Sequence, residues 1–172
     1  TAALAEDTAS GRLDAMIAAE PVDDSRLVPD LLFEDPFYLA VPTADAARIA
    51  PPVAQEIMAL ERLMLLEDGH CMRGQALEIC GRVKPVTMET FGATSLTTLL
   101  HMVSHGMGVT LIPRMARASA NLLPSVSVLP FLDPSPSRSI CLAGRKSNPR
   151  KDDFAALRET VLQAHEALLA RG

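Results

Sequence analysis

Two cysteines nine residues apart carry the clearest chemistry in this chain of 172 residues. Both lie in the segment from 67 to 80, which reads EDGHCMRGQALEIC. Cys71 stands at the predicted start of a helix, next to His70 and two residues before Arg73. A helix N-terminus, an imidazole and a guanidinium each favour the thiolate, which is the nucleophile in peroxide, disulfide and acyl chemistry. The pattern indicates a reactive cysteine, and the alternative is a small buried hydrophobe, as free cysteines often are.

The spacing to Cys80 indicates a conditional disulfide. If residues 72–80 are helical, the rise of ~1.5 Å per residue separates the two Cα atoms by roughly 13 Å. A disulfide requires about 4.4–6.8 Å, so the pair can be joined only if the segment unwinds and repacks. The alternative is that Cys80 packs the helix against the core. The segment lacks the short-spaced ligand pairs of zinc sites, so we expect neither a metal nor another cofactor.

The composition excludes several classes of protein. Hydrophobic residues make up 48% of the chain and charged residues 22%, which predicts a folded domain. Aromatic residues are only 3%, with no Trp, so no stacking platform for single-stranded nucleic acid is expected. Sixteen Lys and Arg against 21 Asp and Glu give a net charge of −5. We therefore expect these residues not to contact DNA themselves, because duplex binding requires a basic surface.

The sequence also carries expectations about location. No apolar run approaches the ~20 residues of a membrane span, so no membrane contact is expected. The first residues lack Met and have no basic region followed by an apolar one, which is unlike a secretory signal and reads as a piece cut from a longer chain. Three cysteines form no disulfide scaffold. A cytoplasmic location is the resulting expectation.

The elements that position the cysteines belong to an α/β pattern. Helices are clearly predicted over 95–105, capped by Thr94 or Ser95 and ended by Gly106, and over 152–170. Weaker helices are predicted over 1–10, 43–60 and 72–80. Short apolar runs predict strands over 13–18, 37–41, 63–66, 85–88, 109–112, 126–129 and 139–143. The alternation predicts a mixed sheet flanked by helices.

The cysteine segment resembles the redox segment of the OxyR family, the hydrogen-peroxide-sensing branch of the LysR-type transcriptional regulators. The family pattern Gly-His-Cys-x-Arg-x-Gln-Ala, with a second Cys nine residues after the first, is matched at Gly69, His70, Cys71, Arg73, Gln75, Ala76 and Cys80. Further stretches match in order at 93–99, 106–113, 11–14 and 138–140. The resemblance covers almost the whole chain. Gly74 departs from it, because an acidic residue is common at that position.

The resemblance implies a fold and a set of partners. The fold would be a two-lobed, periplasmic-binding-protein-like LysR-type regulatory domain, each lobe a mixed sheet flanked by helices. Residues 1–35 plus 138–172 would form a partial lobe I, and residues 36–137 lobe II with both cysteines. The winged helix-turn-helix that binds DNA is absent from this chain. Homodimers or homotetramers are implied, with promoter DNA and RNA polymerase contacted through the full-length protein only.

The resemblance also implies roles for individual residues. Cys71 would be the peroxide-reactive thiolate and Cys80 the resolving cysteine. The peroxide pocket would be formed by Thr1, His70, Arg73 and Arg138. Without the resemblance, Arg138 reads as a solvated charge on a strand edge. Thr94 and Ser95 could cap a helix, present groups to an effector in the interlobe cleft, or do both.

Three functions compete at this point. The first is a non-enzymatic hydrogen-peroxide sensor that regulates transcription in the oxidative stress response by a reversible Cys71–Cys80 disulfide. The second is an ordinary LysR-type effector domain that binds a small metabolite between its lobes. The third is a thiol peroxidase, whose peroxiredoxin type would need Pro and Thr shortly before the cysteine, where this chain has Asp68-Gly69-His70. Cys141, between Ile140 and Leu142, is predicted to be a core residue.

Overall fold

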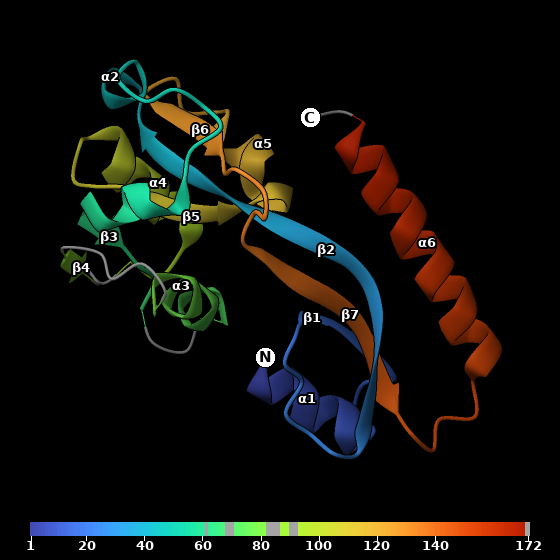
Figure 1. The fold of residues 1–172 in the computed structure, drawn as a ribbon. Helices are drawn as coiled ribbons and strands as arrows, with labels where there is room; N and C mark the ends of the chain where they lie inside the picture. The colour runs from blue at the N-terminus through green and yellow to red at the C-terminus, as the bar shows by residue number, and fades with distance from the viewer. Residues whose placement is uncertain (61, 68–70, 82–86, 90–92, 171–172) are drawn as a thin grey trace. The chain divides into compact units, whose positions relative to one another are not determined.

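The structure is a computed structural model that describes residues 1–60, 62–67, 71–81, 87–89 and 93–170. The side chains of Cys71 and Cys80 are not among the described parts. The chain divides into two compact units (Figure 1). Unit 1 consists of Thr1–Asp35 and Arg138–Gly172, and unit 2 consists of Pro36–Ser137. The chain therefore passes from one unit to the other at two places, Asp35–Pro36 and Ser137–Arg138.

Unit 1 is an antiparallel sheet with two helices. Its elements are α1 (Ala2–Ala9), β1 (Ala15–Ala19), the first part of β2 (Leu27–Pro42), β7 (Ser137–Arg145) and α6 (Lys151–Leu169). Strand β7 lies between β1 and β2. Its register against β1 runs from Ala15 opposite Gly144 to Ala19 opposite Ile140. Two apolar clusters fill the unit, one around Ala5, Met16, Leu27 and Ala143 and one around Ala19, Leu32, Ile140 and Leu142.

Unit 2 holds the segment with the redox motif. Its elements are the second part of β2, α2 (Thr43–Ala46), η1 (Gln55–Leu60), β3 (Arg62–Met64), α3 (Cys71–Gly81), β4 (Thr87–Glu89), α4 (Leu96–Ser104), β5 (Thr110–Pro113), η2 (Arg114–Ala116), α5 (Arg117–Ala120) and β6 (Val126–Pro130). Strand β2 pairs antiparallel with both β5 and β6, and β3 pairs parallel with β4. The mixed α/β class expected from the sequence is confirmed.

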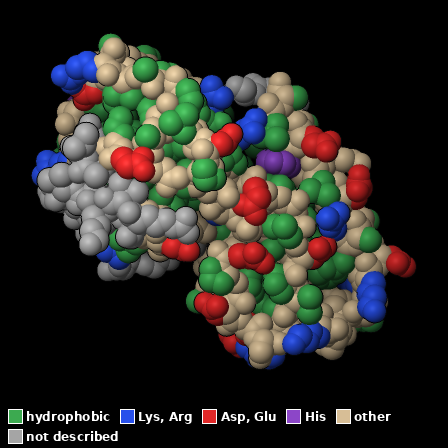
Figure 2. All heavy atoms as spheres, viewed as in Figure 1, with side chains coloured by type: hydrophobic (Ala, Val, Ile, Leu, Met, Phe, Trp, Pro, Cys, Tyr) green, Lys and Arg blue, Asp and Glu red, His purple; other side chains and the backbone are tan. Residues whose placement is uncertain are grey.

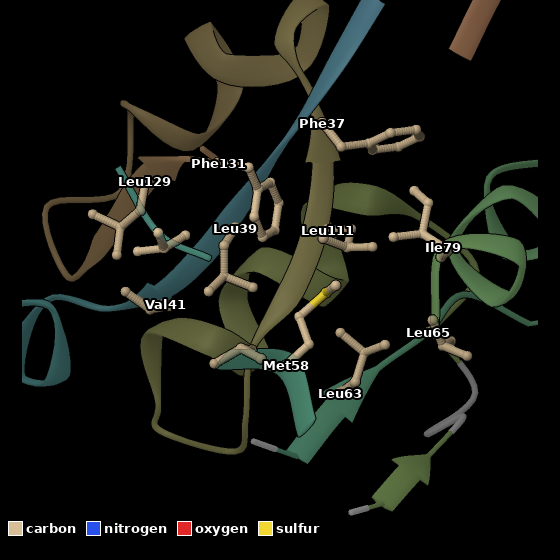
Figure 3. Close-up of a cluster of buried hydrophobic side chains, with 13 residues drawn as sticks. Phe37, Leu39, Val41, Met58, Leu63, Leu65, Ile79, Leu111, Leu129 and Phe131 are labelled. Atoms are coloured by element: carbon tan, nitrogen blue, oxygen red, sulfur yellow. The ribbon is translucent and has the colours of Figure 1, made fainter. Parts of the chain in front are cut away.

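The main core of unit 2 connects β2 to the helix with the cysteines. Figure 3 shows Leu39 of β2, Leu111 of β5 and Ile79 of α3 in one buried cluster. Leu39 is fully buried and Ile79 is 9% exposed. Burial of a side chain of this size contributes about 1.5–3 kcal/mol. Ile79 therefore anchors the last turns of α3 to the sheet.

Local signals predicted the ends of α4 correctly. Ser95 is the N-cap, and its hydroxyl accepts a hydrogen bond from the Thr98 N–H at 3.1 Å. Gly106 has φ +73°, the left-handed conformation that ends a helix at low cost when the residue is glycine. Acidic residues Asp152 and Asp153 occupy the first turn of α6, where the helix dipole favours them.

Two parts of the predicted pattern are wrong. The helix expected over 43–60 is interrupted: α2 ends at Ala46 and η1 begins at Gln55, with Pro51 and Pro52 between them. Proline lacks the N–H that a helix interior requires, which explains the interruption. Strand β2 begins ten residues earlier than the predicted strand over 37–41. Its early part alternates polar and apolar residues irregularly, so its sequence carries no clear strand period.

Candidate functional site

Both cysteines of the motif belong to one helix. Cys71 is the first residue of α3, and Cys80 is the residue before its last, Gly81. The predicted helix over 72–80 is thus confirmed and extends by one residue at each end. With ~1.5 Å of rise per residue, the two Cα atoms lie roughly 13 Å apart, well beyond the span of a disulfide. A continuous helix over this span is therefore incompatible with a disulfide between the two residues.

Among the described side chains of helix α3, only Gly74 and Glu78 are exposed. Ala76 and Ile79 are buried, while Met72 and Leu77 are half-buried. Gly74 is exposed, and a methyl group placed on it would meet nothing within 4 Å. Glycine in a helix interior costs roughly 0.5–1 kcal/mol relative to alanine. The helix is thus anchored along most of its described length and carries one weak helix former, Gly74, near its first turn.

A small cavity lies against the first turns of α3. Its volume is about 10 Å³, and its lining includes Met72, Arg73 and Ala76 from the helix and Thr110 from β5. The Thr110 hydroxyl is buried and donates to the Met64 carbonyl at 2.9 Å. A space of this size holds about one water-sized group. The half-buried Arg73 thus lies against the core of unit 2, within the first turn of the helix.

Gln75, which the sequence analysis names only as part of the motif, has a buried amide oxygen in the structure. Its Oε1 is buried and accepts no hydrogen bond from the residues that the structure describes. It follows Cys71 by four residues, a spacing that places two helical residues on one face. A buried acceptor without a donor costs about 1–3 kcal/mol. Sequence reasoning quoted Gln75 only as part of the motif, and the i, i+4 spacing was the signal that could have singled it out.

Arg138 pairs with a carboxylate that the sequence did not single out. Its Nε and Nη2 donate to Asp35 Oδ2 at 3.1 and 2.9 Å. The Asp35 side chain is 1% exposed and that of Arg138 is 14% exposed. Both residues stand at the border of unit 1, where β2 and β7 leave it. The reading of Arg138 as a solvated edge charge is therefore wrong, because its guanidinium is largely buried against a carboxylate.

The remaining candidate residues are either exposed or outside the described part of the chain. Thr1 is exposed at the start of α1, where its carbonyl accepts from the Ala5 N–H at 2.9 Å. Thr94 and Ser95 are exposed, and Ser95 serves as the helix cap described above. His70 and the thiols of the two motif cysteines lie outside the described part of the chain. The structure thus brings Cys71, Arg73 and Cys80 onto one helix and leaves the peroxide pocket as a whole untested.

The third cysteine behaves as predicted. Cys141 is fully buried in β7, and its thiol donates to the Ala18 carbonyl at 3.5 Å. Burial, together with the charges of Glu20 and Asp30, raises the pKa of this thiol above its ordinary value. A protonated, enclosed thiol is a poor nucleophile, so Cys141 is structural.

The described residues form neither a metal site nor a membrane-spanning helix. Among the described residues, no three His, Cys, Asp or Glu side chains gather into a group that could hold a metal ion. In the same part of the chain no helix is both long and apolar enough to cross a bilayer. Figure 2 shows acidic and basic side chains interspersed over the visible face. That distribution differs from the continuous basic stripe of a duplex-binding surface.

Comparisons with known proteins agree with the motif. The family described as "LysR substrate binding domain" matches residues 1–166. The "DNA-binding transcriptional dual regulator OxyR" of Escherichia coli is 36% identical over 156 residues, which are 88% of this chain and 50% of the relative. The "hydrogen peroxide-inducible genes activator" of Dickeya chrysanthemi is 35% identical with the same coverage. The chain thus spans about half the length of these curated relatives.

Solved structures of OxyR regulatory domains are similar to this chain. The reduced form of the OxyR regulatory domain from Pseudomonas aeruginosa superposes with a TM-score of 0.82 and 32% identity, over 95% of this chain and 79% of that one. The reduced regulatory domain of OxyR2 from Vibrio vulnificus gives 0.81 and 31%, over 95% and 77%. The fold expected from the resemblance, that of a LysR-type regulatory domain, is thereby confirmed.

Proposed function

This chain belongs to the LysR substrate-binding domain family, and we propose that it is the hydrogen-peroxide-sensing regulatory domain of a longer transcriptional regulator. The observation that carries the proposal is the placement of two cysteines in one short helix, the first at its N-terminus. Relatives named for peroxide-inducible gene activation support it. Unit 1 corresponds to a partial lobe I and unit 2 to lobe II.

The first step is oxidation of Cys71. Its thiolate attacks one peroxide oxygen, the O–O bond breaks, and a sulfenic acid forms while the other oxygen leaves as hydroxide and takes up a proton to become water. The positive end of α3 favours the thiolate. The buried Gln75 Oε1, which accepts no hydrogen bond from any described residue, can accept one from the peroxide. His70, Arg73, Arg138 and Thr1 are the proposed partners that orient it and stabilise the developing negative charge.

The second step joins the cysteines. The Cys80 thiolate attacks the sulfenic sulfur, the S–O bond breaks, and hydroxide leaves as water, giving the disulfide. Because roughly 13 Å separates the Cα atoms in the helix, α3 must unwind first. Unwinding exposes Ala76 and Ile79, and the new disulfide offsets part of that cost. Two forms separated by a few kcal/mol constitute a switch.

Oxidation of this domain acts on transcription through the other parts of the proposed full-length protein. In the proposed full-length regulator, homodimers or homotetramers carry winged helix-turn-helix domains that contact promoter DNA, and the full-length protein also contacts RNA polymerase. This chain itself is proposed to act without enzymatic turnover and in the cytoplasm. One oxidation event per domain then changes an assembly rather than consuming peroxide continuously.

Trapping the sulfenic acid tests the proposal. With Cys80→Ser, stoichiometric peroxide gives an intermediate that a dimedone-type probe labels, detected by intact-protein mass. Cys71→Ser gives no label and loses no thiols, and Cys141→Ser behaves like the parent chain and loses two thiols. Sustained turnover with a reductant indicates a peroxidase instead. Loss of no thiols in the parent chain indicates a metabolite-binding domain with incidental cysteines.

A further inference from the structure

Unit 1 contains a cavity that the peroxide chemistry does not use. It has a volume of about 260 Å³ and lies where the end of β7 meets the start of α6. We propose that this cavity binds a small organic anion with an apolar body, of the class of medium-chain carboxylates. The proposal goes beyond peroxide sensing and does not depend on either motif cysteine.

The wall of the cavity is apolar and structurally fixed. Leu142 of β7 and Phe154 of α6 face it, together with Val28 of β2. A methyl group on Gly144 would lie 2.3 Å from two ring carbons of Phe154, so the ring packs directly on the glycine backbone. This contact holds the aromatic wall in place. Apolar walls favour the body of a ligand by about 25 cal/mol for each Å² removed from water.

The charges of the lining are mostly positive. Arg145, Lys146, Arg150 and Lys151 line the cavity, against Asp30 as its one acidic lining residue in the described part. The Asp30 carboxylate lies 3.0 Å from the Arg158 Nε, which offsets its charge. Asp152 and Asp153 of the first turn of α6 are not part of the lining. A local excess of positive charge in a chain of net charge −5 favours an anion.

The two lysines are the cations left for a ligand. Arg145 donates to the Thr8 and Leu13 carbonyls at 2.7 Å each. Arg150 Nη1 lies 3.4 Å from the Asp14 carboxylate. Among the described residues, neither Lys146 nor Lys151 has an acidic side chain within ion-pair distance.

The start of α6 also lies at the cavity. Lys151 is the first residue of the helix, and its N-cap, Arg150, makes no side-chain capping bond. Because Asp152 and Asp153 offset the positive end of the helix dipole, the attraction for an anion is assigned to the lysines. A volume of about 260 Å³ is a little below the usual range of small-molecule pockets, so it suits a small ligand. Octanoate, with one carboxylate and a short alkyl chain, is of that size class and serves as the probe.

The test is titration of the reduced 172-residue chain with octanoate, followed by ¹H–¹⁵N correlation spectra. We expect saturable shifts at the amides of Gly144, Lys146 and Phe154. The variant K146A/K151A, in which both changes lie on the exposed surface, should bind about fivefold more weakly, because each lost ion pair is worth about 0.2–1 kcal/mol. The matched control R12A/R48A removes two exposed cations elsewhere and should bind like the parent.

Neutral and small probes separate the two parts of the claim. 1-Octanol lacks the charge and acetate lacks the apolar body, so each should bind several-fold more weakly than octanoate. V28F, which fills the cavity from a half-exposed position, should abolish the saturable shifts while the chain stays folded by circular dichroism. Equal binding of octanol and octanoate, unchanged affinity in K146A/K151A, or shifts confined to unit 2 would each overturn the proposal.

Discussion

The Asp35 carboxylate accepts two hydrogen bonds from the guanidinium of Arg138, at 3.1 and 2.9 Å, with both side chains largely buried. The pair ties β2 to β7 at the border of unit 1. Removing one partner of a buried ion pair leaves an uncompensated charge and costs about 3 kcal/mol or more. A substitution that removes only one of the two charges should therefore lower the free energy of unfolding strongly.

We predict that Asp35→Asn lowers the free energy of unfolding by about 3 kcal/mol, measured by urea denaturation. The matched control is Asp45→Asn, because Asp45 pairs with Arg48 on the exposed surface and should change stability by less than about 0.5 kcal/mol. Equal losses of unfolding free energy in the two variants would contradict the larger cost that we assign to breaking the buried Asp35 pair.

Gly74 offers a way to change the switch without touching a cysteine. Gly74→Ala adds a methyl group into open space and should stabilise α3 by roughly 0.5–1 kcal/mol. Since the proposed disulfide requires α3 to unwind, stabilising the helix favours the reduced form. The reduction potential should rise by roughly 10–20 mV, measured by redox titration against a dithiol buffer.

Its control is Ala164→Gly, an exposed change in α6 that weakens a helix of the other unit. That variant should leave the potential unchanged. A potential that Gly74→Ala lowers, or leaves where it was despite a more stable reduced protein, contradicts unwinding of α3 as a condition for the disulfide.

The contact between Gly144 and Phe154 should behave as a coupled pair. Gly144→Ala forces the ring to move and should cost about 1–3 kcal/mol, as overpacked sites do. The substitution Phe154→Leu removes the ring that a methyl group on residue 144 would meet. In that background, Gly144→Ala should therefore cost less by at least about 0.5 kcal/mol. Urea unfolding of the four proteins of this cycle measures the coupling. Additive effects would show that the two residues do not touch in solution.

Cys141 should give the protein a distinct response to alkaline pH. Its folded-state pKa is raised above the ordinary 9.0, so the folded protein holds this proton more tightly than the unfolded chain. The resulting stability is complete below pH 9 and is lost as the pH rises toward the folded-state pKa. The free energy of unfolding should fall with pH above about 9 in the parent and less steeply in Cys141→Ala. Parallel slopes would contradict the raised pKa.

Local patterns predicted what depends on local interactions. The α3 helix, the Ser95 cap and the left-handed Gly106 all follow from residues within a few positions of one another. The Asp35–Arg138 pair escaped prediction because its partners lie on strands distant in sequence. The early part of β2 escaped because its pairing with β7, and not its own pattern, makes it a strand.

The discontinuous make-up of unit 1 sets an order of events during synthesis. Unit 2 is a continuous stretch and can fold as soon as Ser137 has left the ribosome. Strand β1 leaves the ribosome before the whole of unit 2, yet its partner β7 ends only at Arg145. Until then the edge of β1 that pairs with β7 is open, and open strand edges are surfaces on which nascent chains associate wrongly. If the ribosome pauses between unit 2 and β7, the nascent chain therefore carries a folded unit 2 together with an unpaired strand β1 that is prone to association.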